Sequence, residues 1–364
     1  LRARFLSGNA FEAVCIDGSA GVELTASRFH MEGTMLLSVD ANDRLAADIQ
    51  MAQAFFEDFN LDVGVIPGSV IELFYADIDD LVAGMLIGQI AEKVPAMIEQ
   101  QFGGFGIEKS VTLYGMDVDF AVKPVSVDFT PQGGTVVLDS RIEVKGEAVA
   151  SGPGYLSTPA SLPLMPSSEA PGDGFRLALA DDVLNQALSA FWAAGVFEQS
   201  FAAGADSDVG LAALVDRVDL TMPFPPTVAA QAIGAAASVT AGDLRLDVIR
   251  IDPATGEEQV VTALALSAEI GLDVETDPTG AVRLQSGSPI AWIDVLDDGV
   301  TGPNILSDAD VELLGSFVAS RLTTMIGGVV GELPIPSFDS AAITNVGTQP
   351  ADGYVMLGGN VEAL

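Results

Sequence analysis

The chain has 364 residues, of which 49% are hydrophobic, and its 15 Lys and Arg residues against 51 Asp and Glu give a formal net charge of −36. This hydrophobic fraction excludes a disordered chain and, at this length, indicates a large core divided between two domains. The negative charge disfavours binding to nucleic acid and to anionic membranes. It indicates solubility of an unusually apolar chain or adaptation to salt, and the alternative is a specific cationic partner.

The first part of the chain alternates like an antiparallel sheet and then becomes helical. Residues 21–66 show the two-residue period of β-strands. Pro67 and the following glycine end this pattern, and Ser69 with Glu72 forms a capping box that predicts a helix over 69–102. The wide apolar face of this helix carries Ile71, Phe74, Ile78, Leu81 and Met85.

Strands and a linker follow this helix. The alternation predicts three strands, at 110–121, 123–130 and 135–145. Residues 150–173 contain five prolines and no long apolar run, which is typical of a linker. We therefore expect an N-terminal domain over 1–149 and a C-terminal domain over 174–364.

The second half begins with a short strand and another apolar helix. The strand is predicted at Phe175–Leu179, and the helix at Asp182–Ala194, with Asp181 as its N-cap and Gly195 as its C-cap. The apolar face of this second helix carries Val183, Leu184, Ala187 and Phe191.

A meander and a third apolar helix come next. Apolar residues alternate from Leu264 to Val274, between hairpin signals at 252–256 and 277–280. Ser307 opens the third helix, whose apolar face carries Val311, Leu314, Val318, Leu322 and Met325 and ends near Val330. Charged residues interrupt both long helices, so neither is interpreted as a membrane span.

The same order of elements occurs in both halves of the chain. A meander, a long apolar helix, a Gly/Pro break and terminal strands follow one another twice, with strands predicted at 342–344 and 354–358 at the end. The helices that start near 69 and 307 therefore occupy equivalent places, which indicates an internal duplication.

The composition disfavours an enzyme or a metal protein. His30 is the only histidine and Cys15 the only cysteine, so a catalytic triad could use only His30, and a His/Cys zinc site cannot form. No Gly-x-Ser-x-Gly motif is present. His30 is interpreted as a turn or edge residue between strand patterns, and Cys15 as a buried, inert thiol.

Two acidic clusters could supply oxygen ligands to calcium, but neither has the spacing of an EF-hand loop. They consist of Asp77, Asp79 and Asp80, and of Asp297, Asp298, Asp308 and Asp310. We interpret them as solvated carboxylates, and the last two as favourable charges in the first turn of a helix.

Three segments resemble the BPI/LBP/CETP-like family of tubular lipid-binding (TULIP) proteins. The first is Gly174 to Ala187, continued by Ala194 to Phe197, which looks like the start of that family's C-terminal barrel. The second is the ending from Leu333 to Pro336, followed by 343–345 and 352–361. The third is the helix over Ile71 to Phe102 that leads into the strands over Val118 to Val144.

The resemblance implies an α+β fold of two pseudo-symmetric barrels, each a twisted antiparallel sheet wrapped on long helices. It also implies that the first barrel lacks its N-terminal elements, which an upstream segment or a protein partner would supply. The family's cationic tip has no counterpart here, and its conserved disulfide could form only if Cys15 pairs with an upstream residue.

We therefore expect a bacterial, extracytoplasmic protein, periplasmic, surface-exposed or secreted, that holds or transfers phospholipid-like molecules. The bacterial assignment rests on a composition rich in Ala, Gly, Val and Asp, with four lysines. The apolar faces of the three helices would line the lipid pockets, with Met side chains adapting to acyl chains. No cofactor other than a bound lipid or fatty acyl ligand is expected. The alternative is a structural or adhesive component of a bacterial surface assembly, with lipid as filler.

Overall fold

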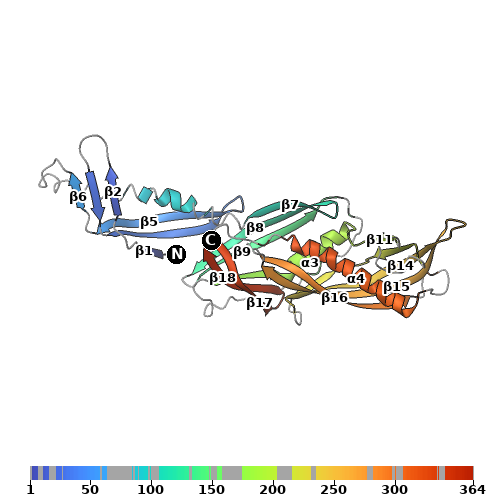
Figure 1. Cartoon of the computed structure of the whole chain (residues 1–364). Helices are drawn as coiled ribbons and strands as arrows, with labels where there is room; N and C mark the ends of the chain where they lie inside the picture. The colour runs from blue at the N-terminus through green and yellow to red at the C-terminus, as the bar shows by residue number, and fades with distance from the viewer. Residues whose placement is uncertain are drawn as a thin grey trace. The chain divides into compact units, whose positions relative to one another are not determined.

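The computed structural model of the chain is built mainly from β-strands with a few helices, which confirms the α+β class (Figure 1). It describes residues 2–6, 11–15, 22–26, 28–57, 60–63, 84, 87–88, 90–96, 99, 106–130, 133–146, 148, 154–157, 174–202, 215–230, 235–276, 282–296, 300, 306–333, 335 and 341–363.

The contacts divide the chain into two compact units. The first comprises Leu1–Gly106 and Lys123–Asp139, and the second comprises Ile107–Val122 and Ser140–Leu364. The domain limits expected near 149 and 174 remain predictions. Of the expected linker, the structure describes residues 154–157, which are exposed.

The first unit contains two described sheets of short and long antiparallel strands. Their orders are β1-β4-β5 and β2-β3-β6. The strands are β1 (Arg2–Leu6), β2 (Phe11–Cys15), β3 (Val22–Ala26), β4 (Arg28–Val39), β5 (Leu45–Glu57) and β6 (Asn60–Val63). These strands confirm the alternating pattern predicted from residue 21 onwards.

His30 lies inside β4, which corrects its interpretation as a turn or edge residue. β4 pairs with β1 on one side and β5 on the other, so it is the central strand of its sheet. The His30 ring stacks on Phe55 with 4.8 Å between ring centroids, and its Nε2 lies 3.0 Å from Oε2 of Glu57. These cross-strand contacts accommodate the polar His30 ring inside β4. The sequence pattern instead indicates two separate strands on either side of His30.

Helical residues are described within 84–99, where the sequence predicts the first long helix. Glu99 Oε1 accepts a hydrogen bond from the Ala47 amide of β5 at 3.0 Å. The expected lining residues of this helix, Ile71, Phe74, Ile78, Leu81 and Met85, lie outside the described residues, as do the acidic positions 77, 79 and 80.

Three antiparallel strands follow in the order β7-β8-β9. They are β7 (Ile107–Leu113), β8 (Met116–Thr130) and β9 (Gly133–Val144). The strand predicted at 110–121 is wrong, because Tyr114 and Gly115 turn the chain there with φ of 53° and 80°. Pro124, next to the predicted boundary, instead lies buried inside β8.

The second unit also pairs the start of the C-terminal half with its end. Strand β10 pairs with β18, which pairs with β17. Their bounds are Gly174–Ala180 for β10, Ala341–Ala351 for β17 and Tyr354–Ala363 for β18. The three strands predicted in these places are present, and the last two are longer than the sequence pattern indicates.

The largest described sheet has the order β11-β12-β14-β15-β16, with β13 also paired to β14. Its strands are β11 (Gln199–Ala202), β12 (Arg217–Thr221), β13 (Thr227–Ala230), β14 (Ala237–Ile251), β15 (Glu258–Thr276) and β16 (Val282–Leu296). The alternation predicted for β15 is confirmed, since Leu264, Leu266 and Ile270 are buried on one face. Gly256, with φ of 72°, turns the hairpin predicted between β14 and β15, and the signal at 277–280 lies outside the described residues.

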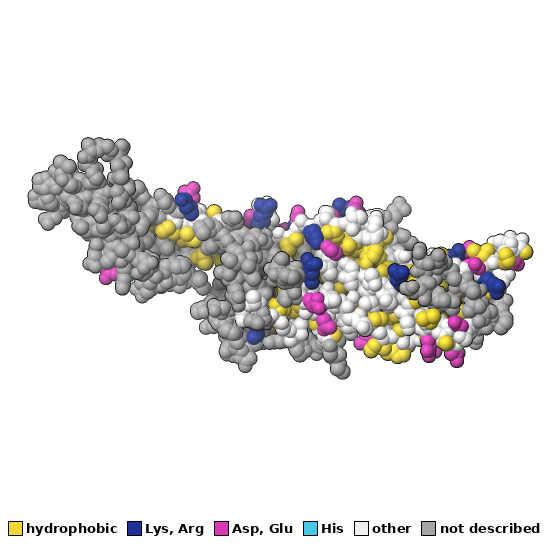
Figure 2. All heavy atoms as spheres, in the orientation of Figure 1, with side chains coloured by type: hydrophobic (Ala, Val, Ile, Leu, Met, Phe, Trp, Pro, Cys, Tyr) yellow, Lys and Arg dark blue, Asp and Glu magenta, His cyan; other side chains and the backbone are white. Residues whose placement is uncertain are grey.

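Two helices cover this sheet, α3 (Asp181–Ala193) and α4 (Asp308–Gly331). Asp181 is the first residue of α3 and not its N-cap, because Ala180 occupies the cap position. By length and mean hydropathy, α4 is the one described helix that could cross a membrane, and half of its apolar window is buried within the protein. Figure 2 shows hydrophobic side chains on the visible surface, interspersed with basic and acidic side chains.

Candidate functional site

The candidate site is the apolar interior between the largest sheet and helices α3 and α4. The sheet is curled, and α4 lies along it (Figure 1). Helix α4 contacts both the first and the last strand of the sheet order, β11 and β16. Phe201 of β11 packs edge-on against Phe317 of α4, with 5.6 Å between ring centroids. At the other end, Ile293 of β16 lies against Gly315 of α4. Helix α4 therefore closes the open side of a half-barrel.

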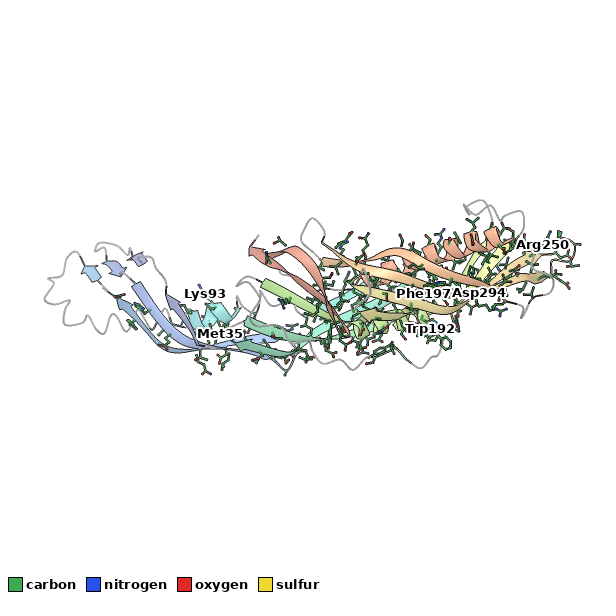
Figure 3. All side chains as sticks on the ribbon, turned by 90° about the horizontal axis from the view of Figure 1, so that it is seen from below. Met35, Lys93, Trp192, Phe197, Arg250 and Asp294 are labelled. Carbon is green, nitrogen blue, oxygen red and sulfur yellow. The ribbon has the colours of Figure 1, made fainter. Side chains whose placement is uncertain are left out.

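Polar side chains fix α3 against β13. The Asn185 Nδ2 donates to the Val228 carbonyl at 3.1 Å, and the Val228 amide donates to Asn185 Oδ1 at 2.6 Å. The side chain thus substitutes for a neighbouring strand. Trp192 Nε1 donates to the Met222 carbonyl at 2.7 Å and anchors the other end of α3. Figure 3 shows Trp192 and Phe197 at this end of the helix.

Glycines let α4 approach its neighbours closely. A Cβ placed on Gly315 would lie 3.0 Å from Ile293 Cδ1, and one on Gly327 would lie 2.6 Å from Ser286 Oγ. A Cβ on Gly328 would meet the hydroxyl of Tyr114. That hydroxyl donates to the Met325 carbonyl at 3.0 Å. The backbone of α4 therefore packs directly on β16 and on the β7–β8 turn.

The structure brings together every predicted lining residue that it describes. Eight belong to one buried cluster and Val183 packs against it. The eight are Leu184, Ala187, Phe191, Val311, Leu314, Val318, Leu322 and Met325. All are at most 8% exposed, so their side chains fill the interior. Whether they contact a lipid remains a prediction.

Sequence reasoning missed the residues that form the other walls of this interior. Val118 and Phe120 of β8 and Val239 and Leu246 of β14 belong to the same cluster. Their two-residue alternation is a signal for a buried strand face. It does not indicate that the β7–β8 hairpin and the C-terminal helices share one core, because the segments are distant in the chain.

An open pocket of about 400 Å³ lies beside the end of α3. It is lined by Met116, Ile142, Glu143, Val144, Lys145, Gly146, Ala148, Ala190, Ala193 and Ala194. At roughly 30 Å³ for each water molecule, this volume corresponds to about thirteen waters.

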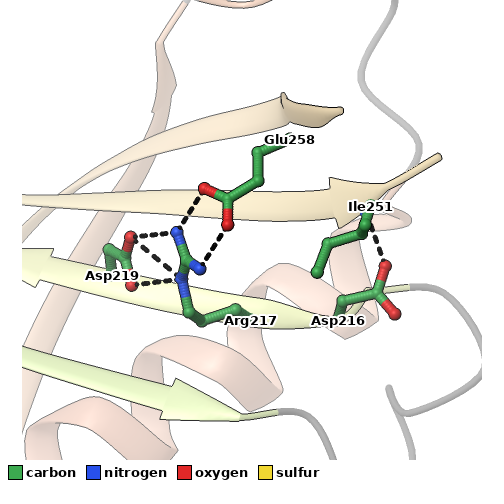
Figure 4. Close-up of polar contacts among 5 residues, drawn as sticks. All are labelled: Asp216, Arg217, Asp219, Ile251 and Glu258. Carbon is green, nitrogen blue, oxygen red and sulfur yellow. Dashed lines mark hydrogen bonds and ion pairs between the residues drawn. The ribbon is translucent and has the colours of Figure 1, made fainter. Parts of the chain in front are cut away.

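Several of the described ionisable groups form ion pairs between strands. Arg217 of β12 reaches across β14 to Glu258 of β15 with two hydrogen bonds of 2.8 Å, and also binds Asp219 (Figure 4). The guanidinium holds the pKa of Glu258 below its usual range. Asp119 behaves alike, because hydrogen bonds from Lys145 and Ser110 lower its pKa. These pairs join strands of the same sheet, across β14 for Arg217 and Glu258.

One buried carboxyl group differs. Asp181 is 4% exposed, its Oδ2 accepts a hydrogen bond from the Ala230 amide at 3.3 Å, and its Oδ1 has no partner among the described residues. Burial raises its pKa. Asp308 and Asp310 lie in the first turn of α4 as predicted, and the described residues contain no cluster able to hold a metal ion.

No protein-family model matches this chain, and no curated protein sequence matches it. Among solved structures, it is similar to a crystal structure of a lipopolysaccharide-binding protein, with a TM-score of 0.52 and 13% sequence identity. The match covers 94% of this chain and 76% of the other. At this identity the similarity concerns the fold, so this chain has a fold similar to that of a lipopolysaccharide-binding protein.

Proposed function

We propose that this chain is an extracytoplasmic protein that binds lipids of the phospholipid type in the interior between the curled sheet and helices α3 and α4. The observation that carries the proposal is that the predicted lining residues of α3 and α4 meet in one apolar interior. Helix α4 alone closes the open side of that interior. The similarity in fold to a lipopolysaccharide-binding protein supports a lipid ligand. Two pseudo-symmetric barrels, as the family resemblance implies, are part of this proposal.

Lipid uptake would require α4 to move. Leu184, Phe191, Val318 and Leu322 are fully buried, so the described interior is filled by side chains. Helix α4 closes the sheet through backbone contacts at glycines, and displacing it opens the interior along β16. Each buried acyl methylene would contribute about 0.8 kcal/mol, so a bound chain would replace the contacts that α4 loses.

A disulfide that fixes α4 to β16 tests this proposal. A Cβ on Gly327 would lie 3.4 Å from the Ser286 Cβ, just below the range of about 3.5–4.5 Å found in disulfides. In a Cys15→Ser background, we expect oxidised Ser286→Cys/Gly327→Cys to lose uptake of a labelled phospholipid from vesicles. Uptake should return after reduction.

The matched control is Ser286→Cys alone in the same background, which cannot form the crosslink and should take up lipid under both conditions. Equal uptake by the oxidised and reduced double variants would show that lipid does not enter beneath α4. A reduced protein that co-purifies with lipid but never exchanges it would favour the structural or adhesive role instead.

A further inference from the structure

The tip of the β7–β8 hairpin contacts the backbone of α4 through one side chain. The Tyr114 hydroxyl donates to the Met325 carbonyl at 3.0 Å and to the Thr324 carbonyl at 3.3 Å. Carbonyls inside a helix already accept hydrogen bonds from amides four residues further on, so the hydroxyl adds a second bond. It reaches them because residue 328 is a glycine, where a Cβ would meet the hydroxyl. The contact therefore depends on a tyrosine that faces a glycine.

The backbone of this turn is unfavourable for tyrosine in the absence of that contact. Tyr114 has a φ of 53° and Gly115 a φ of 80°. Turns of this kind usually contain Asn, Asp or Gly, because a bulky side chain is strained at positive φ. Such strain persists only where the surrounding structure holds it, and it is common at parts of proteins that switch between conformations. The contact with α4 supplies that hold.

The base of the hairpin is anchored separately from its tip. Val118 and Phe120 of β8 are 0% and 2% exposed and belong to the main buried cluster. Leu113 and Met116, on either side of the turn, are only partly buried against it. Among the described residues, β7, β8 and β9 pair only with one another, so no backbone ladder joins the hairpin to the sheet that α4 covers. The tip can therefore leave α4 while the base stays in place.

A second contact lies just beyond the end of α4, where Lys109 of β7 pairs with Glu332 at 2.9 Å. Both side chains are 44% exposed, and ion pairs of that kind contribute little in water. The bond from Tyr114 to Met325 is partly buried and needs no charge. Tyr114 is therefore the stronger of the two contacts. Both act on the C-terminal half of α4, which also carries the contact of Gly327 with Ser286 of β16.

We propose that the β7–β8 hairpin is a latch that keeps α4 closed on β16, and that detachment of Tyr114 controls the entry of lipid into the interior. The inference rests on the proposed function for the ligand that enters. The opening of α4, however, can be measured without any lipid, so the two proposals are tested by separate readouts.

A buried thiol on α4 measures its opening. Val329 is 0% exposed and follows Gly328, so in a Cys15→Ser background the thiol of Val329→Cys reacts with a maleimide only when α4 lifts. Tyr114→Phe keeps the ring and removes the hydroxyl. We expect it to raise the labelling rate about fivefold, which corresponds to about 1 kcal/mol for the lost hydrogen bonds. The free energy of opening obtained from labelling should be smaller than the free energy of unfolding in urea, because the core stays folded.

Lipid entry is measured in the same proteins with Val329 restored. The probe is a fluorescent phosphatidylcholine carried in phosphatidylcholine vesicles. The initial rate of uptake should rise in Tyr114→Phe by about the same factor as the labelling rate. Gly328→Ala displaces the hydroxyl by another route, and it should accelerate labelling and uptake as well.

The matched control is Thr112→Ala, which also removes one hydroxyl group from the hairpin. The Thr112 Oγ1 donates to Asp117 Oδ1 at 2.9 Å, between β7 and β8. Because this bond lies within the hairpin, the variant should show the labelling and uptake rates of the unmodified chain.

Each remaining outcome decides one of the two proposals. Labelling of Tyr114→Phe at the rate of Thr112→Ala would overturn the latch. Faster labelling with an unchanged rate of uptake would show that the latch does not control entry, and the proposed function would stand. Faster labelling in proteins that take up no lipid would overturn the proposed function, and the hairpin would remain a latch on α4 alone.

Discussion

At the scale of single residues, Tyr114 and Gly328 depend on each other although they are 214 positions apart in the chain. Sequence patterns do not connect residues at that separation. Gly328 leaves room for the Tyr114 hydroxyl, which donates to the Thr324 and Met325 carbonyls at 3.3 and 3.0 Å. Burial raises the pKa of this tyrosine. The pair therefore attaches the β7–β8 turn to α4.

The effect of Gly328→Ala on the free energy of unfolding should change sign when the residue at position 114 is changed. In the unmodified chain the new methyl group displaces the Tyr114 hydroxyl, and we expect a loss of about 1 kcal/mol or more in the free energy of unfolding. With Tyr114→Asn, which suits the positive φ of that turn, the alanine should instead stabilise α4 by up to about 1 kcal/mol. Urea unfolding of the four proteins measures the coupling. Additive effects would contradict a direct contact.

Local sequence patterns predicted the elements that depend on residues nearby in the chain. They failed to predict contacts between residues that are distant in the chain. The alternation around Leu264 predicted β15, and Ser307 marked the start of α4. Asn185 gave no sign of its partner Val228, 43 positions away. The turn at Tyr114 was missed because its signal is backbone conformation, and tyrosine is not a typical residue there. The candidate site was predicted on its helices and missed on its sheet for the same reason.

At the scale of elements, α4 is stabilised at its start by its own capping residues. Along its length it is stabilised by contacts with β16 and Tyr114. Ser307 accepts a hydrogen bond from the Asp310 amide, and the Asp310 side chain accepts one from the Ser307 amide, which completes a capping box. The bonds from Ser307 lower the pKa of Asp310. At the other end, Lys109 of β7 pairs with Glu332 at 2.9 Å. A helix that moves as a unit needs this intact first turn.

Ser307→Ala should reduce the free energy of unfolding by about 1 kcal/mol at neutral pH, since it removes the cap. The contribution of Asp310 is present above the ordinary aspartate pKa of 3.8 and is lost as the pH falls through its lower folded value. The difference between the two proteins should therefore narrow in acid. Urea titrations at neutral pH and near pH 3 measure it, with Ser316→Ala on the exposed face of α4 as the control. If the difference in the free energy of unfolding between the two proteins does not change with pH, the stabilisation by Ser307 does not depend on the ionised Asp310 carboxylate.

At the scale of the whole molecule, the net charge of −36 limits which surfaces the protein approaches. Several of the few basic side chains form ion pairs: Lys145 pairs with Asp119, Arg141 with Glu143 and Arg217 with Glu258. A fold similar to that of a lipopolysaccharide-binding protein therefore carries a surface that repels anionic headgroups. The similarity in fold does not extend to the ligand, so the surface charge is the more direct guide to binding at a membrane.

The salt dependence of vesicle binding tests this conclusion. We expect binding to anionic vesicles to be much weaker than binding to zwitterionic vesicles at about 0.01 M salt, where the Debye length is about 30 Å. The difference should shrink near 1 M salt, where that length falls to about 3 Å and repulsion is screened. Flotation of the protein with vesicles of both compositions across this range measures it, and lipopolysaccharide micelles should behave like the anionic vesicles. Tight binding to anionic lipid at low salt that fades as salt is added would instead require a local basic surface that outweighs the net charge.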